Sequence, residues 1–349
     1  MDSNKPKAVA LISGGLDSML AARVVKDQGV HVEGINFFTG FCVEGHTHAI
    51  RKKDRDRPKR NNALWVAEQL DIRLHMIDVV EEYKKVVINP KHGYGANLNP
   101  CLDCKTFMVS KALAWMGAHG FDFIVTGEVI NQRPMSQRRR CMPVIAGESG
   151  AGDLLLRPLC AGHLPETLPE RRGWVSRDKL HAFHGRSRKP QIALAARFGL
   201  EDFAQPAGGC CFLTDKNYAA KLTDLWQAQG DRDYELDDIM LLKVGRHLRP
   251  RPHFKVIIGR EDGENKFLEG YKKLFANVRM VSHMGPLALI DGRLDDDDDI
   301  IFAARLTARF SQGRDEPIVR VEFVNTDGSR RQLDVVPMPT AEISTSWYV

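Results

Sequence analysis

Short apolar runs alternate with longer mixed stretches over the first half of the chain, and the runs predict strands while the stretches predict helices. Such alternation predicts an α/β fold built on a doubly wound parallel sheet, whose ligands bind at the carboxyl ends of the strands. Ser13, Phe38 and Thr126 lie at three such ends. The predicted strands cover residues 8–12, 30–38, 73–79 and 121–126, and the predicted helices begin at Met19 and cover 61–70, 106–117 and 188–198.

The pattern changes near residue 235, where shorter apolar runs are separated by turns. Residues 239–244, 254–259 and 319–324 are predicted to be strands of a smaller α+β domain. The Pro- and Gly-containing segment 205–209 predicts a boundary. We therefore expect a nucleotide-binding domain over residues 1–205, a connecting helix or linker over 206–234, and the second domain over 235–349.

Composition narrows the class of protein. The 349 residues are 43% hydrophobic and 27% charged, and no apolar stretch reaches the about 18 residues of a membrane span, so we expect a cytoplasmic protein without membrane association. The net charge is +5 and is concentrated in basic stretches at 51–60, 137–140 and 246–251, which favour RNA as a partner. The acidic run 295–299 is interpreted as a solvated loop without chemistry.

The hexapeptide Ser13-Gly14-Gly15-Leu16-Asp17-Ser18 joins the first predicted strand to a helix. Backbone N–H groups at a helix start, together with its positive dipole end, bind phosphates, and glycines let the backbone approach the anion. Ser13 and Ser18 add hydroxyl donors, and Ser18 is predicted to be the N-cap of the helix. The loop has neither the Gly-Lys-Ser/Thr of a Walker loop nor the third glycine of a dinucleotide fingerprint.

This hexapeptide resembles the signature of the PP-loop ATP pyrophosphatases, Ser-Gly-Gly-x-Asp-Ser. The resemblance implies a Rossmann-like domain that cleaves Mg²⁺-bound ATP between its α and β phosphates and adenylates a carbonyl oxygen. Ser13, Gly14, Gly15, Leu16, Asp17 and Ser18 would bind the nucleotide, and Asp17 would orient Mg²⁺ or the phosphates during catalysis.

A second motif follows the strand predicted to end at Thr126. Residues 126–137 resemble the Thr-Gly-Glu-x-x-x-Gln-x-x-Ser-Gln element of tRNA 4-thiouridine synthetases, and residues 155–159 resemble the Leu-Arg-Pro-Leu element of tRNA-thiolating relatives. The resemblance implies that the adenine lies near Phe37, Thr126 and Gly127, and that Gln132 belongs to the nucleotide site.

Seven cysteines in a chain expected in the cytoplasm favour thiol or metal chemistry over a disulfide framework. Cys101 and Cys104 open a predicted helix in a Cys-x-x-Cys motif, which is typical of half a zinc site, a dithiol redox couple or two corners of an iron–sulfur cluster. The adjacent Cys210 and Cys211 are candidates for a third ligand. Cys42, Cys141 and Cys160 are interpreted as packed or incidental thiols.

These cysteines also resemble those of a subset of PP-loop tRNA-thiolating enzymes. That resemblance implies a four-iron or three-iron cluster on Cys101, Cys104 and Cys211. Cys211 is favoured over Cys210 because residues 211–218 resemble the element around the later active cysteine of 2-thiouridylases.

The C-terminal part resembles the RNA-binding domain of NFACT proteins, through residues 244–247, 258–265 and 285–286. Together the resemblances imply an ATP-dependent tRNA sulfurtransferase that makes thiouridine, most simply 4-thiouridine. Because no rhodanese domain is recognised, its sulfur would come from free sulfide or from a persulfide-carrying protein. Because no THUMP domain is recognised, its RNA would be recognised by the C-terminal domain. The alternatives are a PP-loop enzyme with another substrate and a zinc-bound Cys-x-x-Cys motif, or an RNA-binding factor that senses nucleotide.

Overall fold

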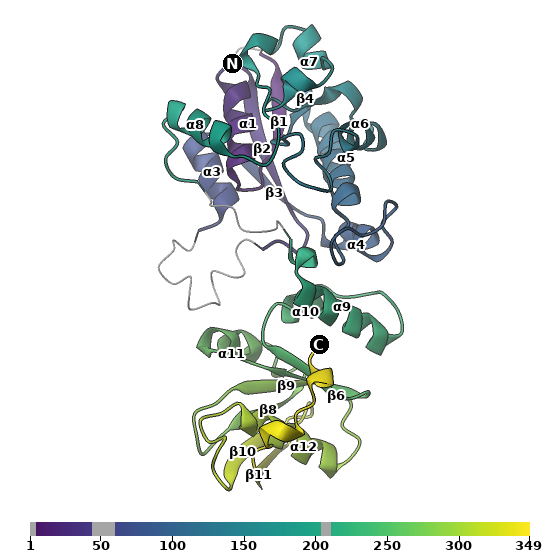
Figure 1. The fold of residues 1–349 in the computed structure, drawn as a ribbon, viewed down its shortest axis with the longest axis vertical. Helices are drawn as coiled ribbons and strands as arrows, with labels where there is room; N and C mark the ends of the chain where they lie inside the picture. Colours follow the sequence, from purple (N-terminus) through teal and green to yellow (C-terminus); the bar gives the residue numbers. More distant parts are fainter. Residues whose placement is uncertain (1–4, 44–59, 204–210) are drawn as a thin grey trace. The chain divides into compact units, whose positions relative to one another are not determined.

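The computed structural model describes residues 5–43, 60–203 and 211–349 (Figure 1). They form two compact units, one ending at Cys211 and the other beginning at Phe212. The predicted boundaries at residues 205 and 235 stay predictions. Among the described residues, no helix has the length and apolar character needed to cross a membrane.

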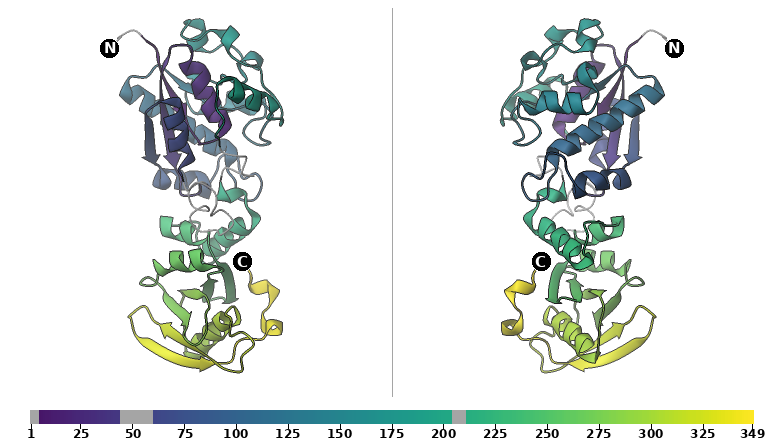
Figure 2. Two further views of the ribbon diagram at one scale, coloured as in Figure 1. Left: turned by 90° about the vertical axis from the view of Figure 1, so that its left-hand side faces the viewer. Right: turned by 90° about the vertical axis from the view of Figure 1, so that its right-hand side faces the viewer.

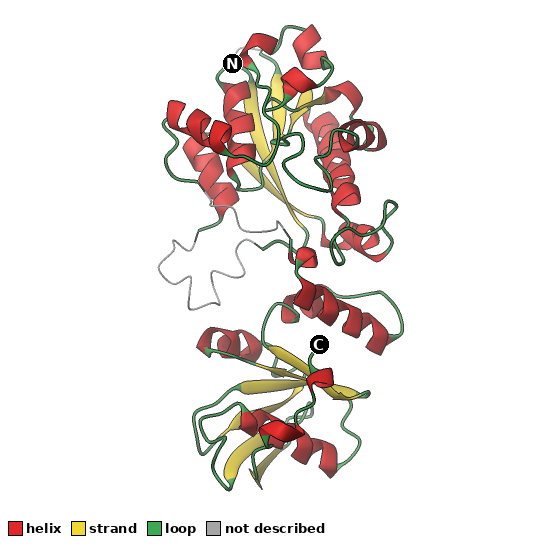
Figure 3. Ribbon diagram, viewed as in Figure 1, coloured by secondary structure: helices red, strands yellow, loops and turns green. Residues whose placement is uncertain are grey.

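The N-terminal unit is built on a five-stranded sheet of order β3-β2-β1-β4-β5, in which neighbouring strands are parallel (Figure 3). Side views show α1 and α3 over one face and α5 over the other (Figure 2). The elements are β1 (Lys7–Leu11), α1 (Leu16–Lys26), β2 (His31–Phe38), α3 (Asn62–Leu70), β3 (Leu74–Asp78), α4 (Val80–Ile88), α5 (Cys101–His119), β4 (Phe123–Val125), α6 (Cys141–Glu148), β5 (Leu155–Leu156), α7 (Leu168–Arg171) and α8 (Lys189–Arg197).

The order of these strands locates a binding site. From β1 the chain passes to β2 and β3 on one side and then returns to β4 on the other side of β1. Ligands of doubly wound sheets bind at the carboxyl ends of strands where the order reverses. The segments that follow β1 and β4 meet at this point, and they contain the hexapeptide loop and the Thr126 motif.

The C-terminal unit has a six-stranded antiparallel sheet of order β11-β10-β8-β9-β7-β6. One face packs its apolar residues against α12, and a smaller cluster on the opposite face joins β7 and β9 to α10 and α11. The elements are α9 (Lys216–Gln229), α10 (Leu236–Leu241), β6 (Arg246–Arg251), β7 (Phe254–Ile258), α11 (Asp262–Glu269), β8 (Ala276–Met280), β9 (Leu287–Gly292), α12 (Asp297–Arg309), β10 (Val319–Val324) and β11 (Arg330–Val335).

Two sequence-based predictions for this unit are wrong. Residues 239–244, predicted to be a strand, belong to α10 and the turn after it, because Glu235 and Asp238 form a capping box that starts a helix. The acidic run is not a solvated loop, since Asp296 caps α12 through its side chain and Asp299 is 1% exposed.

Candidate active site

The hexapeptide loop connects β1 to α1. Gly14 adopts φ +79°, a left-handed conformation that favours glycine, and Gly15 is the N-cap of α1. The prediction that Ser18 caps the helix is wrong, because Ser18 lies within the first turn and is 6% exposed. Its hydroxyl donates to the Gly15 carbonyl (2.8 Å) and accepts from the Ser13 backbone N–H (3.3 Å). Because Gly15 has no side chain, it cannot accept hydrogen bonds from the first backbone N–H groups of α1. These N–H groups are therefore available to bind an anion.

Asp17 is the centre of a polar network at this loop. Its Oδ2 accepts hydrogen bonds from Gln132 Nε2 (2.6 Å) and Arg188 Nη2 (3.1 Å). Gln191 Nε2 in turn donates to Gln132 Oε1 (2.7 Å). The second oxygen, Oδ1, is buried and has no hydrogen-bond partner. The hexapeptide loop Ser13–Ser18 is called the phosphate loop below, after its predicted ligand. A carboxylate oxygen left unpaired beside it fits the oxygen ligand that Mg²⁺ prefers.

The Thr126 motif packs directly against this network. A Cβ atom placed on Gly127 would lie 2.4 Å from the backbone oxygen of Asp17 and 2.5 Å from the backbone nitrogen of Ser18. Glycine is therefore required for the two loops to touch. Thr126 is buried and donates from Oγ1 to Glu128 Oε2 (3.1 Å), so its hydroxyl supports the loop.

Glu128 and Arg157 join the two motifs through a buried ion pair, with Arg157 Nε 2.8 Å from Glu128 Oε2. The side chains are 2% and 5% exposed, respectively. Burial alone raises the pKa of Glu128, but the charges of Arg157 and Lys105 and hydrogen bonds from Arg157 and Thr126 outweigh it, so the pKa lies below its usual range. Glu128 is therefore an ionised structural anchor.

Two of the predicted nucleotide-binding residues are largely enclosed. Leu16 is 1% exposed and belongs to the hydrophobic core, so only its backbone is available to a ligand. Phe37, near the carboxyl end of β2, is 8% exposed. The structure brings Ser13–Ser18, Thr126, Gly127 and Gln132 together, and their roles toward a nucleotide stay predictions.

Cys101 and Cys104 lie in the first turn of α5, which begins five residues before its predicted start. Both are half-buried, and Cys101 Sγ donates to Ser136 Oγ (3.2 Å) in the Thr126 motif. Cys211 is half-buried and forms an isolated antiparallel bridge with Cys42. Cys210 lies outside the described residues.

The described cysteines do not form a site for a single metal ion. A tetrahedral zinc site holds its sulfur ligands about 4 Å apart. Within the described chain, the one group of three ligands with such spacing contains no cysteine. Because Cys210 lies outside the described residues, the zinc alternative and the polynuclear cluster both stay predictions. Cys160 is fully buried, which raises the pKa of its thiol to about 12 and keeps it protonated.

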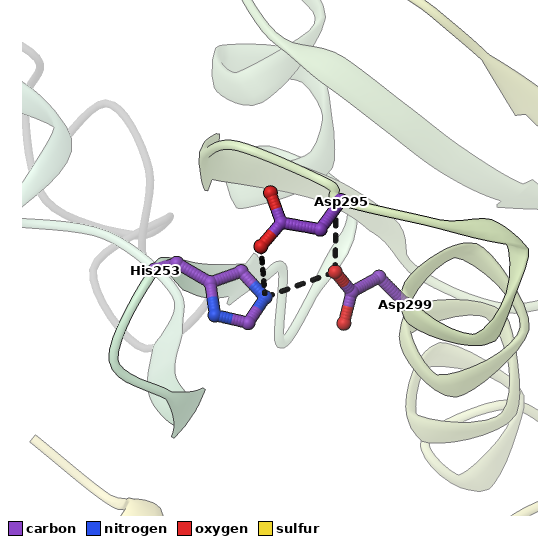
Figure 4. A group of neighbouring side chains, drawn as sticks. All are labelled: His253, Asp295 and Asp299. Carbon is purple, nitrogen blue, oxygen red and sulfur yellow. Dashed lines mark hydrogen bonds and ion pairs between the residues drawn. The ribbon is translucent and has the colours of Figure 1, made fainter.

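The group of three ligands that does form is His253, Asp295 and Asp299, at the start of α12 (Figure 4). Its charges are already balanced. Asp299 accepts from His253 Nε2 (2.9 Å), from the Asp295 backbone N–H (2.8 Å) and from Arg251, while Arg293 pairs with Asp295. The group therefore fixes the helix start and carries no proposed metal chemistry.

The three basic stretches differ in how many of their side chains are exposed and unpaired, and so could contact RNA. Residues 51–59 lie outside the described residues, and Arg60 pairs with Asp202 and stacks on Trp65. Arg138, Arg139 and Arg140 are exposed in the turn before α6. In the third stretch, Arg249 pairs with Asp224 and Arg251 with Asp299, so these two arginines serve the packing of their own unit.

Sequence analysis missed Arg188 and Gln191. They lie at the start of α8 and reach Asp17 and Gln132 across 171 and 59 residues of sequence. The one sequence feature that points to them is the start of the predicted helix, Arg188-Lys189-Pro190-Gln191, which contains basic and amide side chains that could bind a ligand. These residue types do not show that the helix start lies next to Asp17 in the folded protein.

Comparison with known proteins gives two family matches. Residues 6–143 match the tRNA methyl transferase HUP domain, and residues 245–348 match the NFACT protein RNA binding domain. The N-terminal part of the chain is thus similar to the tRNA methyl transferase HUP domain, and the C-terminal part to the NFACT RNA-binding domain.

Curated relatives include two proteins named tRNA-specific 2-thiouridylase MnmA. The one from Petrotoga mobilis is 33% identical over 134 residues, 37% of this chain and 36% of that protein. The one from Pelobacter propionicus is 24% identical over 274 residues, 76% and 67% of the two chains. The chain thus spans about a third of the length of the Petrotoga relative.

Solved structures are more distant. A 4-thiouridine synthetase–RNA complex with bound ATP has 24% identity and a TM-score of 0.32, and covers 44% of this chain and 36% of its own. The C-terminal part of a fibronectin/fibrinogen-binding protein from Streptococcus suis has 16% identity and a TM-score of 0.27, and covers 47% and 79%.

Proposed function

We propose that the chain is an ATP-dependent tRNA sulfurtransferase acting in the cytoplasm, in which a PP-loop domain of the tRNA-thiolation superfamily is followed by an NFACT-type RNA-binding domain. The observation that carries the proposal is Asp17, held on one oxygen by Gln132 and Arg188 while its other oxygen is unpaired at the phosphate loop. This arrangement fits Mg²⁺-bound ATP.

The first step is adenylation of a uridine carbonyl. The carbonyl oxygen attacks the α-phosphorus of ATP, the bond between the α and β phosphates breaks, and pyrophosphate leaves. The N–H groups at the start of α1, the hydroxyl groups of Ser13 and Ser18, and Arg188 stabilise the negative charge that develops on the leaving group. Asp17 orients Mg²⁺, and Gln132 and Gln191 keep the Asp17 carboxylate in place.

The second step replaces AMP by sulfur. A sulfur nucleophile attacks the activated carbon of the base, the C–O bond to AMP breaks, and thiouridine is released. A persulfide on Cys211, supplied by a protein or small-molecule donor, provides this sulfur. In the alternative route, Cys101, Cys104 and Cys211 would hold the predicted iron–sulfur cluster, which would supply an iron site for sulfide, and Cys211 would then carry no persulfide.

The thiolated position has two candidates, each with its own support. The motif over residues 126–137 resembles that of 4-thiouridine synthetases and favours 4-thiouridine. The names of the curated relatives favour 2-thiouridine. Mass spectrometry of the nucleosides against authentic standards separates the two isomers.

The test is release of pyrophosphate and AMP from ATP, with and without an unmodified tRNA transcript. We expect tRNA to stimulate release, and Asp17→Asn to abolish it because an amide binds Mg²⁺ weakly. Asp27→Asn, at an exposed ion pair with Arg23 at the far end of α1, is the matched control and should retain the wild-type rate. Release without tRNA dependence supports another substrate, and tRNA binding without any release supports a nucleotide-sensing factor.

A further inference from the structure

Cys42 and Cys211 lie opposite each other in the N-terminal unit. Cys42 follows the end of β2 by four residues and forms an isolated antiparallel bridge with Cys211. Both residues are half-buried, and no disulfide joins them. From the sequence alone, Cys42 is interpreted as a packed or incidental thiol.

The backbone pairing brings these two thiols within bonding reach. Residues directly opposite in an antiparallel pair have Cα atoms about 4.5–5.5 Å apart, and their side chains point to the same side. Disulfides span Cα distances of about 4.4–6.8 Å. A bond between Cys42 and Cys211 therefore requires no change in the backbone pairing. In this structure Cys42 Sγ lies 3.6 Å from Thr39 Oγ1, so forming the bond needs only a side-chain rotation of Cys42, whereas Cys101 directs its Sγ to Ser136.

We propose that Cys42 is the resolving thiol of Cys211. This inference rests on the proposed function, in which Cys211 carries a persulfide. The Cys42 thiolate attacks the Sγ atom of Cys211, the sulfur–sulfur bond of the persulfide breaks, and hydrosulfide leaves. The two cysteines are oxidised to a disulfide while the terminal sulfur is reduced to sulfide, so the electrons balance.

The released hydrosulfide is the nucleophile for the adenylated base. It forms beside the carboxyl ends of β1 and β2, the edge of the sheet at which the phosphate loop lies. A small-molecule or protein dithiol then reduces the Cys42–Cys211 disulfide and resets the site. Cys42 thus converts the persulfide sulfur on Cys211 into free hydrosulfide, and its thiol is oxidised once per turnover.

The experiment loads the reduced, full-length protein with inorganic tetrasulfide and removes the excess. Sulfide release is then measured, and the unreduced digest is mapped by mass spectrometry. We expect about one sulfide per chain and a peptide linking Cys42 to Cys211. Cys42→Ser should keep its persulfide and release little sulfide. Cys141→Ser is the matched control and should behave as wild type.

A Cys210→Ser variant resolves the ambiguity between the adjacent cysteines, and it should retain the linked peptide. A wild-type disulfide between Cys211 and Cys101, or sulfide release by Cys42→Ser at the wild-type rate, overturns the inference. The assay uses neither ATP nor tRNA. Its failure is therefore distinguishable from a failure of the proposed function.

A second inference concerns the RNA surface of the C-terminal unit. On the sheet face opposite α12, α10 and α11 cover β7 and β9, while the part formed by β8, β10 and β11 carries polar side chains. A groove of about 500 Å³ lies there. Its lining residues are Lys272, Lys273, Asn277, Arg279, Glu322, Val324, Asn325, Thr326, Asp327, Gly328 and Arg330.

The groove lining has a net positive charge, and some of its cations form no ion pair within the described part of the unit. It contains four cationic and two acidic side chains. Arg279 neutralises Glu322 (2.8 Å) and Lys272 lies 3.8 Å from Glu269, whereas Lys273 and Arg330 are exposed and have no ion-pair partner among the described residues. The arginines of β6 differ, since Arg249 and Arg251 are paired within the unit. Amide and hydroxyl groups of Asn325 and Thr326 add hydrogen-bonding capacity beside the cations.

We infer that this groove binds RNA phosphates, in place of the stretch 246–251 that the sequence favours. The inference deepens the proposed function by locating its tRNA contact in this unit. Phosphates fit because lysine and arginine without acidic partners can release counterions from the RNA backbone.

The test measures binding of the full-length protein to an unmodified tRNA transcript at several salt concentrations, without ATP. We compare the triple variant Lys272→Gln, Lys273→Gln and Arg330→Gln with a control triple of equal charge change, Lys266→Gln, Arg293→Gln and Arg314→Gln. The groove triple should bind at least about tenfold more weakly, and its salt slope should fall in magnitude by about 0.7–0.9 for each lost contact.

The control triple should change affinity less than the groove triple, because Lys266, Arg293 and Arg314 lie outside the groove and all three have acidic partners, whereas two of the three substituted groove cations have none in the part of the chain that the structure describes. Equal losses in the two triples would mean that only net charge matters and would overturn the inference. Unchanged affinity of the groove triple would also overturn it. Pyrophosphate release is not read in this assay, so the outcome is independent of catalysis.

Discussion

Gly127 shows how one residue type fixes the candidate site. The Thr126 motif can lie against the start of α1 only because position 127 has no side chain, since an added Cβ would lie 2.4 Å from the Asp17 backbone. The clash would involve backbone atoms, which cannot rotate away as a flexible side chain can. The phosphate loop and the motif loop are therefore coupled through this contact.

Gly127→Ala should displace the phosphate loop and weaken ATP binding by more than about tenfold, an effect of about 1.4 kcal/mol or more. Gly117→Ala, inside α5 with nothing within 4 Å of the added Cβ, is the matched control and should bind ATP as wild type does. Equilibrium binding of a non-hydrolysable ATP analogue measures both. Equal affinities in the two variants would contradict the packing argument.

Glu128 gives a prediction about stability and pH. Glu128→Gln leaves Arg157 buried without its counter-charge, which costs about 3–5 kcal/mol of unfolding free energy at neutral pH. Because the folded-state pKa of Glu128 is lowered, its stabilisation is present above about pH 4.3 and is lost as the pH falls through the folded pKa.

The difference between wild type and Glu128→Gln should therefore shrink in acid, when measured by urea unfolding at pH 7 and near pH 3. Glu148→Gln, an exposed carboxylate paired with Lys91 and His92, provides the control and should change stability little. A difference for Glu128→Gln that grows in acid would contradict the sign of the pKa shift.

At the scale of elements, helix α8 contributes to the site through its first turn. Arg188 precedes α8, reaches Asp17, and keeps its side chain 23% exposed. Gln191, which is fully buried, supports Gln132 from the same helix. One helix thus holds two members of the Asp17 network.

Arg188→Gln should lower the rate of pyrophosphate formation by about 10²-fold, because a preorganised positive charge at the leaving group is lost. It should also raise the Mg²⁺ concentration needed for half-maximal rate, since Asp17 loses an orienting hydrogen bond. Lys189→Gln, exposed on the same turn, is the control. Arg188→Lys keeps the positive charge and should recover part of the rate. If Arg188→Gln lowered the rate only by destabilising α8, keeping the charge in Arg188→Lys would not restore it.

The elements also show how far the sequence predicts the structure. Val319–Val324 forms the strand that its alternating pattern predicts, and the phosphate loop and Thr126 motif meet because each follows a strand of one parallel sheet. Residues 239–244 were misassigned, since a short apolar run has no unambiguous period and the capping box before it decides. The contacts of Arg188 and of Cys42 span more than 160 residues, and no local pattern encodes such a distance.

At the scale of the whole molecule, the chain combines a candidate nucleotide site with a unit that is similar to an RNA-binding domain. The N-terminal unit has the phosphate loop and the half-buried cysteines Cys101, Cys104 and Cys211. The C-terminal unit has the cationic groove. The proposed adenylation of a base within RNA uses both, because it needs bound ATP and bound RNA.

The central claim is transfer of sulfur to tRNA with cleavage of ATP to AMP and pyrophosphate. Its most direct test incubates an unmodified tRNA transcript with wild-type protein, ATP, Mg²⁺ and ³⁵S-labelled sulfide or persulfide donor, followed by nucleoside analysis of the RNA. We predict labelled thiouridine, with AMP, pyrophosphate and thiouridine formed in equal amounts, and none of the three with Asp17→Asn. Formation of AMP and pyrophosphate without sulfur in the RNA, or cleavage of ATP to ADP and phosphate, would contradict the account.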